Sequence, residues 1–227
     1  MLPLKDNVPT RRFPIVTVTL IAVNVAVWTF YELPHLNQSV DELGFHPCEV
    51  TNSCPVVGED WELTAVTSMF MHGSWVHLLG NMLFLWIFGN NVEDSMGRVR
   101  FIVFYFFAGF AATALQATVT LSTGPEAGTR IPFIGASGAI SGVLGAYFVL
   151  LPRAKVLTLV FFFLPWRLPA WVFLVIWFAF QLTSSSAALQ HPEAGGGVAF
   201  FAHVGGFLFG ALSVRAFQTQ EPLRPAY

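Results

Sequence analysis

Charge is scarce in this sequence. Of its 227 residues, 11% are Asp, Glu, Lys or Arg and 55% are hydrophobic, whereas a typical soluble domain carries about 25% charged residues. A soluble core could not hide so much apolar surface, so we expect lipid to be the solvent for much of the chain. The net charge of −2 gives no indication of nucleic-acid binding, and basic residues are better interpreted as a signal of membrane topology.

Repeats and low-complexity segments are also missing, so we expect neither a transporter built from two halves nor a second domain. The first apolar run lacks a small-residue cleavage site and is not expected to be a removed signal peptide. The two cysteines, Cys48 and Cys54, leave a small disulfide and two free thiols both open. Because two cysteines cannot complete a zinc shell, we expect no metal, and we expect no cofactor.

Long uncharged runs predict the fold class, an all-α polytopic membrane protein with six transmembrane helices. A spanning helix needs about 20 mostly apolar residues. The apolar segment 156–166 is too short to cross and is expected to be an interfacial or extended piece before the fifth span. The six runs that are long enough lie at residues 13–31, 63–92, 101–125, 131–151, 168–190 and 194–214.

Basic residues predict the orientation. With the N-terminus inside, ten of the eleven Lys and Arg residues fall in inner segments, and only Arg130 falls outside. This distribution places both termini in the cytoplasm, and we expect the plasma membrane of a prokaryote. The expected layout is a solvated cytoplasmic arm at 1–12, a six-helix domain at 13–216 with an external first loop at about 32–62, and a cytoplasmic tail at 217–227.

Polar residues inside the spans gather at one depth. His77 and Asn81 are four residues apart near the start of the second span, and His72 precedes them. Ser137 lies in GASGAISG at the start of the fourth span, and His203 lies in AHVGGFLFG at the start of the sixth. Because these three spans all begin at the outer face, the three clusters can share one cavity.

These residue types fit nucleophilic catalysis. A serine hydroxyl needs a base to take its proton, and neutral imidazole is the usual base, which suits Ser137 and His203. The attacked carbonyl becomes an oxyanion, for which the helix start at Ser137, His77 and Asn81 offer donors. No Asp or Glu lies in the middle of a span, so we expect a Ser–His dyad without an aspartate.

Small residues support a meeting of the fourth and sixth spans. Gly138 with Gly142, and Gly206 with Gly210, form pairs that are four residues apart. Such pairs allow two helix backbones to approach closely, as a direct hydrogen bond between the serine and the histidine requires.

The motifs GASG, AHVGG and HGSWVHLLGNM, on alternate spans and at matching depth, resemble the signatures of rhomboid intramembrane serine proteases. The resemblance covers residues 13–216 and implies cleavage of a peptide bond in or beside the transmembrane helix of a single-span membrane protein. It also implies that the substrate enters from lipid, past the fifth span and the loop before the sixth. It gives roles to Ser137 as nucleophile, His203 as base and acid, Asn81, His77 and the Ser137 N–H as oxyanion hole, and Gly135, Gly138 and His72 as residues that shape the site.

Two departures from the family pattern bear on the site. Many rhomboids carry Trp-Arg just before the second-span motif, where this chain has Trp61 and Glu62. Some carry an aromatic residue one turn below the nucleophile, where this chain has Ser141, so His203 must be held in another way.

Other interpretations of the same residues stay open. A membrane serine can simply pack or cap a helix, Ser141 is a rival nucleophile, and facing histidines can ligate haem. A non-catalytic rhomboid-like protein that binds membrane helices is the alternative function, but it would be expected to lack the serine or the histidine, and this chain keeps both. Asn24, Gln116 and Gln181 are expected to form interhelical hydrogen bonds.

Overall fold

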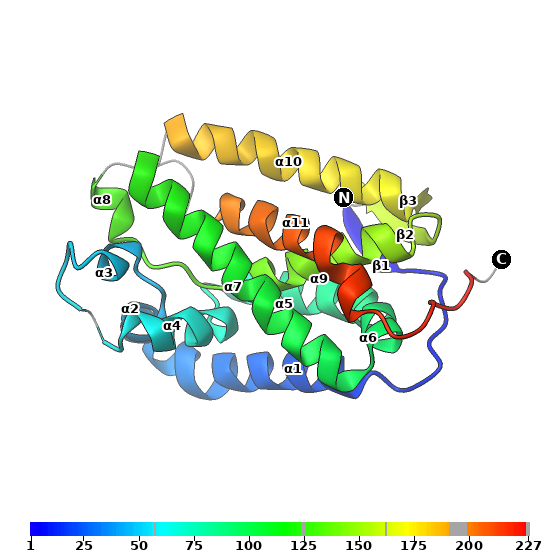
Figure 1. The fold of residues 1–227 in the computed structure, drawn as a ribbon, viewed down its shortest axis with the longest axis horizontal. Helices are drawn as coiled ribbons and strands as arrows, with labels where there is room; N and C mark the ends of the chain where they lie inside the picture. Colours follow the sequence, from blue (N-terminus) through cyan, green and yellow to red (C-terminus); the bar gives the residue numbers. More distant parts are fainter. Residues whose placement is uncertain (57, 124–125, 162, 191–198, 226–227) are drawn as a thin grey trace.

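The computed structural model describes residues 1–56, 58–123, 126–161, 163–190 and 199–225. Helices dominate it, and the long ones run roughly along the longest axis of the molecule (Figure 1). Among these described residues, three helical stretches are long and apolar enough to cross a membrane, and two shorter apolar helices accompany them. The helical membrane fold therefore agrees with expectation, while the count of six spans and the side of the termini stay predictions. The three long stretches are Ile15–Leu43, Arg98–Thr123 and Phe200–Phe217, and the shorter helices are Ser137–Leu150 and Ala170–Ser184.

The first helical stretch changes its winding towards its C-terminal end. Pro34 has no N–H to continue an α-helical ladder, which accounts for a 3-10 turn at this point. Asn24 donates to the carbonyl of Leu20 at 2.7 Å, within its own helix, so the prediction of an interhelical hydrogen bond is wrong for Asn24. In order, the stretch comprises α1 (Ile15–Val27), a π-helical turn (Trp28–Glu32), the 3-10 turn (Leu33–His35) and α2 (Leu36–Leu43).

The second predicted span, 63–92, is not one helix, which corrects our expectation. Its N-terminal part folds as a short helix, a 3-10 turn and a loop, and the long apolar helix begins only at Trp75. Ser74 sets this start, because its side-chain oxygen accepts the His77 backbone N–H at 3.1 Å. The elements are α4 (Trp61–Thr67), a 3-10 turn (Ser68–Phe70), α5 (Trp75–Phe84), a π-helical turn (Leu85–Gly89) and α6 (Asn90–Met96).

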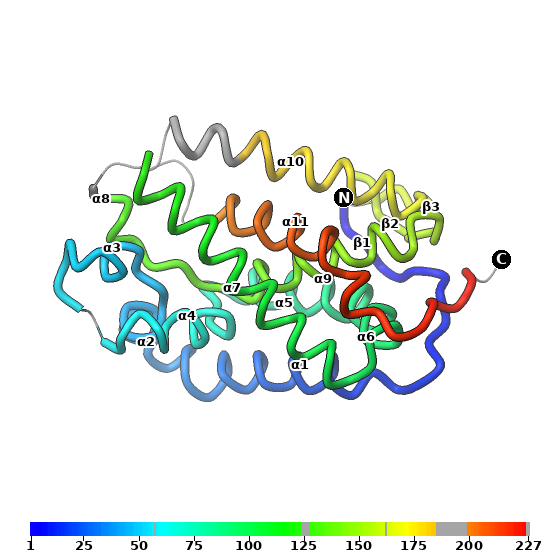
Figure 2. The backbone as a smooth tube through the Cα atoms, in the orientation of Figure 1, coloured from blue at the N-terminus to red at the C-terminus, as the bar shows by residue number. Residues whose placement is uncertain are grey.

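The helix α9 (Ser137–Leu150) is the centre of the bundle. Every residue from Gly138 to Tyr147 is buried. α7 (Arg98–Thr123) and α11 (Phe200–Phe217) both pack against α9, while α10 (Ala170–Gln190) lies on the outside (Figure 2). A residue at the start of α9 is thus surrounded by other helices, and α10 forms an outer wall.

A three-stranded antiparallel sheet corrects two expectations. The fold is not all-α, and the N-terminal arm is not wholly solvated, since its first residues pair with β2. Extended structure had been one of the two forms expected for 156–166, and it is confirmed. The run KVLTLV is rich in β-branched residues, and Val156 and Thr158 are buried while their neighbours Lys155, Leu157 and Leu159 are more accessible, as in a half-buried strand. The strands are β1 (Leu2–Lys5), β2 (Lys155–Val160) and β3 (Leu164–Pro169).

A disulfide between Cys48 and Cys54 closes the loop that the sequence predicts to lie on the outer side. The loop is tied to the segment before α9, because Phe45 and Phe133 exchange two backbone hydrogen bonds, at 3.0 and 2.8 Å. Two short helices lie in these connections, α3 (Pro47–Val50) and α8 (Glu126–Thr129).

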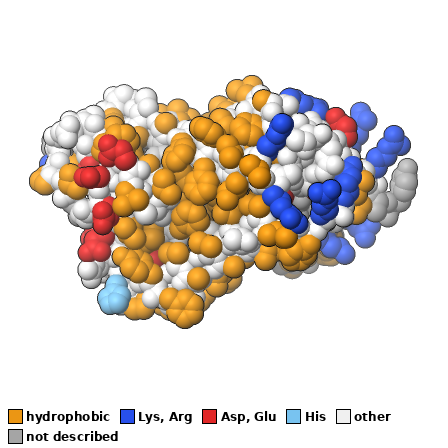
Figure 3. Space-filling view, turned by 60° about the horizontal axis from the view of Figure 1, so that its bottom comes forward, with side chains coloured by type: hydrophobic (Ala, Val, Ile, Leu, Met, Phe, Trp, Pro, Cys, Tyr) orange, Lys and Arg blue, Asp and Glu red, His pale blue; other side chains and the backbone are white. Residues whose placement is uncertain are grey.

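Charged and apolar side chains are segregated on the surface. Figure 3 shows hydrophobic side chains over the middle of one face, acidic side chains towards one end, and lysine and arginine towards the other. Several large apolar side chains are almost fully exposed, among them Phe30 (82%) and Leu212 (83%). An apolar belt between two polar ends suits a protein that is embedded in a bilayer.

Candidate active site

Ser137 is the first residue of α9. The chain reaches it through Gly135, whose φ of +125° lies in the region that favours glycine. This turn is fixed by the Gly135 N–H, which donates to the Ser68 carbonyl at 2.8 Å. The N–H groups of the first turn of α9 have no acceptor in their own helix, so free donors and the positive end of the helix dipole are available beside Ser137. The serine thus lies at a helix start, as the sequence predicted.

His203 approaches this serine from α11. Its Nε2 lies 2.7 Å from Ser137 Oγ. The two helices touch through their glycines, because a Cβ at Gly206 would collide with the carbonyl oxygen of Gly138. A Cβ at Gly210 would likewise collide with the carbonyl oxygen of Gly142. The contact that was predicted between the helices of Ser137 and His203 is therefore confirmed.

Gln181 of α10 orients the imidazole. Its Oε1 lies 2.8 Å from His203 Nδ1. Because an amide oxygen only accepts, this hydrogen bond assigns the proton to Nδ1 and leaves Nε2 free to accept from the Ser137 hydroxyl. The Trp177 ring, one turn earlier on α10, lies 6.1 Å from the imidazole between ring centroids. Gln181 does form the interhelical bond that was expected, but the sequence did not reveal that its partner is the histidine.

Ser141 occupies the place where some rhomboids carry an aromatic residue. Its side chain is buried, and its hydroxyl donates to the Ser137 carbonyl at 2.6 Å, within its own helix. The proton of this rival nucleophile is therefore engaged with the backbone, whereas that of Ser137 faces an imidazole nitrogen.

Two side chains of α5 face the same region. His77 Nδ1 accepts the Gly73 backbone N–H at 3.5 Å, which leaves Nε2 as the N–H donor. A Cβ at Gly135 would lie 2.9 Å from both Cε1 and Nε2 of His77, so the imidazole stands directly against the turn before the serine. Asn81 follows one turn later on the same helix face. Gly138, by contrast, lies inside α9, where a Cβ would come within 2.6 Å of Ala112.

His72 lies in the loop before α5 and holds Asn81. Its Nε2 is 3.1 Å from Asn81 Nδ2. The loop is itself held by Glu32, whose Oε1 accepts the His72 backbone N–H at 2.7 Å. Glu32 is the last residue of the π-helical turn within the first helical stretch and is fully buried, an environment in which a carboxyl group is costly. Sequence reasoning missed this residue, because it directly follows an uncharged run and was counted as the start of the outer loop.

A cavity of about 220 Å³ joins these groups between α5 and α10. Val76 lines it and is 82% exposed, so the cavity opens to the surface along α5. Its polar lining consists of His77, Asn81, Ser137, Ser141, Gln181 and His203, and its apolar lining includes Phe84, Leu144 and Trp177.

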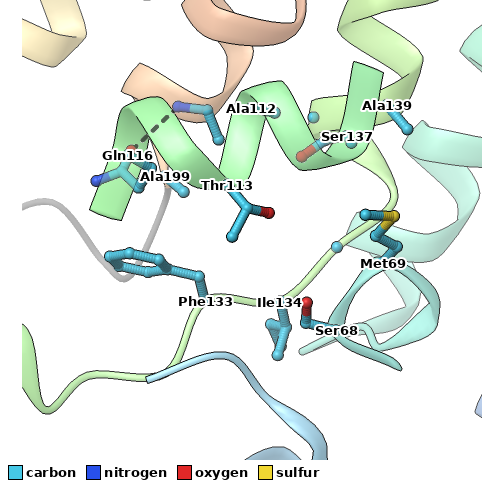
Figure 4. Close-up of a pocket in the computed structure, with 14 residues that line it drawn as sticks. Ser68, Met69, Ala112, Thr113, Gln116, Phe133, Ile134, Ser137, Ala139 and Ala199 are labelled. Atoms are coloured by element: carbon cyan, nitrogen blue, oxygen red, sulfur yellow. Dashed lines mark hydrogen bonds between the residues drawn. The ribbon is translucent and has the colours of Figure 1, made fainter. Parts of the chain in front are cut away.

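A second, smaller cavity of about 30 Å³ lies on the other side of Ser137. Figure 4 shows Ser68 and Thr113 around it, with Gln116 at one edge. Gln116 Oε1 accepts the Ala202 N–H of α11 at 3.1 Å, which is the interhelical bond expected of it. A space of this size with several polar side chains in its lining has room for a water molecule.

The family model of the Rhomboid domain matches residues 59–218. This range includes every residue that lines the cavity between α5 and α10. The chain belongs to the rhomboid family. Rhomboid protein 1, mitochondrial, of Saccharomyces cerevisiae is 30% identical over 195 residues, which are 85% of this chain and 50% of that protein. Presenilin-associated rhomboid-like protein A, mitochondrial, of Danio rerio is 30% identical over 141 residues, or 61% of this chain and 33% of that protein.

Rhomboid protease GluP of Bacillus subtilis is 40% identical over 95 residues, which are 42% of this chain and 17% of that protein. The chain therefore spans half or less of the length of each of these three relatives. The rhomboid family includes proteases, as the name of GluP states. Two of the three relatives are mitochondrial, so they give no support to the predicted plasma membrane of a prokaryote.

Proposed function

We propose that this rhomboid is an intramembrane serine endopeptidase that cleaves transmembrane-helix substrates near the outer membrane face with a Ser137–His203 dyad. The observation that carries the proposal is the 2.7 Å distance between Ser137 Oγ and His203 Nε2, in a cavity that opens to the apolar surface. A serine and an imidazole in this geometry are the minimum for nucleophilic attack on a carbonyl carbon.

In the first half-reaction, Ser137 Oγ attacks the scissile carbonyl carbon while its proton moves to His203 Nε2. The carbonyl oxygen takes the electron pair of the broken π bond and becomes an oxyanion. His203 then gives the same proton to the leaving amine nitrogen as the C–N bond breaks, and an acyl-enzyme remains. Throughout, the hydrogen bond from Nδ1 to Gln181 keeps the imidazole in one orientation.

Three donors suit the oxyanion. They are the Nε2–H of His77, the second amide hydrogen of Asn81, and the backbone N–H of Ser137 at the start of α9. Preorganised donors of this kind each contribute about 10²–10³ in rate when they are aimed at the developing charge.

In the second half-reaction, a water molecule attacks the acyl carbon and gives its proton to His203. His203 then returns this proton to Ser137 Oγ as the bond between Oγ and the acyl carbon breaks. The small cavity behind Ser137 is a source of this water, since Ser68, Thr113 and Gln116 give a water molecule polar partners in an otherwise apolar lining. The products are a carboxylic acid and the regenerated dyad.

The substrate class follows from the surroundings of the cavity. A helix hides its carbonyls in internal hydrogen bonds, so it must unwind before attack, and an unwound backbone is tolerated in a membrane only inside protein or beside water. The opening between α5 and α10 gives such a place to a single-span helix that arrives from lipid. The loop before α11, which the family resemblance also implicates, lies outside the described residues.

The test is cleavage of a tagged single-span substrate by the purified protein in vesicles. We expect Ser137→Ala and His203→Ala each to lower kcat/KM by at least about 10³-fold. Ser141→Ala is the matched control and should keep activity within about tenfold of wild type, because its hydroxyl serves its own helix. Undiminished cleavage by Ser137→Ala would refute the dyad. Binding of the substrate without cleavage by the wild type would favour the non-catalytic helix binder.

A further inference from the structure

The end of the molecule that carries the Lys and Arg residues has a cavity of about 730 Å³, on the face of the sheet that is directed away from the core. The strand register sets Lys5 opposite Leu157, and Leu157 opposite Arg167, and cross-strand partners share one face of a sheet. Lys155 precedes Leu157 by two residues and therefore lies on the same face. Val156, on the other face of β2, is fully buried. The basic side chains thus stand on the face directed away from the core.

Five cations line this cavity, and they come from segments far apart in the sequence. Besides the three basic residues of the sheet, Arg153 comes from the turn before β2 and Arg224 from the C-terminal tail. Within the described part of the chain, none of the five has a carboxylate within ion-pair distance, whereas Arg11 at the same end pairs with Asp94 at 2.8 Å. Topology alone requires basic residues at this end, but it does not require them to surround one cavity unpaired. Such a cluster favours an anion at its centre.

The acidic side chain in the described lining, Asp6, does not neutralise the cluster, because it is engaged elsewhere. Its Oδ2 accepts the Tyr147 hydroxyl at 2.5 Å and the Asn91 amide at 2.7 Å. Asn7, its neighbour, accepts the Lys155 backbone N–H at 2.7 Å. The carboxylate and the amide therefore fix β1 against α9 and β2, and they leave the cationic side chains available.

The hairpin formed by β2 and β3 indicates where the anion comes from. Phe161 and Phe163 at its tip are 73% and 77% exposed, and Trp166 on β3 is 59% exposed. Aromatic side chains gather at the membrane–water interface, where rings contact acyl chains and headgroups. A hairpin that presents such rings beside Lys155 and Arg167 lies at headgroup depth, so the nearest phosphates are those of the lipids.

We propose that this cavity binds the phosphate-bearing headgroup of an anionic phospholipid in the leaflet next to the sheet. The phosphate lies among the Lys and Arg side chains, and the acyl chains run along the hairpin and α10. Because β2 and β3 connect α9, which carries Ser137, to α10, which carries Gln181, the bound lipid stabilises the inner ends of both helices.

The test compares lipid retention by native mass spectrometry of the full chain, purified in detergent and mixed with palmitoyl-oleoyl phosphatidylglycerol or phosphatidylcholine. The pocket variant is the double substitution Lys155→Gln with Arg167→Gln. The matched control is Arg98→Gln with Arg100→Gln, which removes two exposed cations from the same end outside this cavity. We expect wild type and control to retain phosphatidylglycerol in preference to phosphatidylcholine, and the pocket variant to lose about tenfold or more of that retention.

Equal retention by the pocket variant and the control, or equal retention of the two lipids by wild type, would overturn the proposal. A third arm adds inorganic phosphate, and full displacement of phosphatidylglycerol at millimolar phosphate would assign the cavity to a soluble phosphate compound instead. The unfolding midpoint in mixed micelles of detergent and phosphatidylcholine should be the same for both double variants. If the pocket variant does not fold, Arg153→Gln with Arg224→Gln makes the same comparison without altering the strands.

Discussion

Gln181 Oε1 accepts a hydrogen bond from His203 Nδ1 at 2.8 Å, in the position where a Ser–His–Asp triad has its carboxylate. The amide fixes the tautomer and the ring orientation without adding a charge to the membrane interior, where a carboxylate would be costly. This relationship explains how an imidazole is oriented although the described spans bring no acid to it.

Removing this amide should slow chemistry more than it weakens binding. We expect Gln181→Ala to lower kcat by about tenfold to a hundredfold with little change in KM, because the imidazole loses its orientation while the substrate contacts remain. Gln181→Glu keeps an acceptor for the Nδ1–H and should retain more activity than Gln181→Ala. Initial rates over a range of substrate densities in vesicles measure both constants. Equal kcat for wild type and Gln181→Ala would show that the hydrogen bond has no part in orientation.

Glu32 should act on the site through the loop that it holds. Its carboxylate accepts the His72 N–H, and His72 in turn accepts from Asn81, so the chain of bonds ends at a proposed oxyanion donor. We expect Glu32→Ala to lower kcat by about tenfold or more, and Glu32→Gln, whose amide oxygen can still accept, to stay near wild type. The measurement is the split between kcat and KM, with the unfolding midpoint recorded in parallel. A loss of stability in Glu32→Ala with unchanged kcat would leave Glu32 a structural role only.

A methyl group at Gly206 should separate α9 from α11. Helix propensity alone predicts that Gly→Ala stabilises a helix by up to about 1 kcal/mol, but a Cβ here collides with the Gly138 carbonyl. We therefore expect Gly206→Ala to destabilise the protein by about 1–3 kcal/mol and to lower cleavage. Gly80→Ala is the control for stability, since a Cβ there meets no heavy atom within 4 Å. Thermal unfolding in detergent distinguishes the two, and a Gly206→Ala variant as stable as Gly80→Ala would contradict the close contact.

Asp6 gives the stability a pH dependence. Burial raises its pKa above the ordinary value, and the hydrogen bond from Tyr147 offsets part of this effect. The folded protein therefore holds the Asp6 proton more tightly than the unfolded chain does. The contribution is most favourable at low pH and is lost as the pH rises through the folded-state pKa. We expect the unfolding midpoint of Asp6→Asn to fall less than that of wild type between pH 4 and pH 7. Asp41→Asn, at an exposed position, should follow wild type, and identical curves for all three would exclude Asp6 as the cause.

Much of the site was predictable because membrane sequences restrict polar residues so strongly. Ser137, His203, His77 and Asn81 were found as polar groups at one depth in apolar runs, and the glycine pairs predicted which helices touch. Glu32 and Gln181 were harder to assign. Their roles depend on which faces of the π-helical turn Trp28–Glu32 and of α10 meet the site, and the apolar pattern of a helix in lipid does not fix its rotation.

The fold was predicted less completely at its two ends. The helix begins at Trp75 because Ser74 caps it there. The run 63–92 is uncharged throughout, so its composition alone did not indicate this break. The sheet depends on pairing between Leu2 and Leu159, residues far apart in sequence, and such long-range pairing leaves little trace in either segment alone.

The most direct test of the central claim is covalent labelling of the folded protein with a fluorophosphonate, followed by mass mapping of the modified peptide. Ser137, activated by His203, should carry the label, Ser141 should not, and labelling should fall by at least about a hundredfold in His203→Ala. Labelling of Ser141, or undiminished labelling of Ser137 in His203→Ala, would contradict a dyad formed by these two residues.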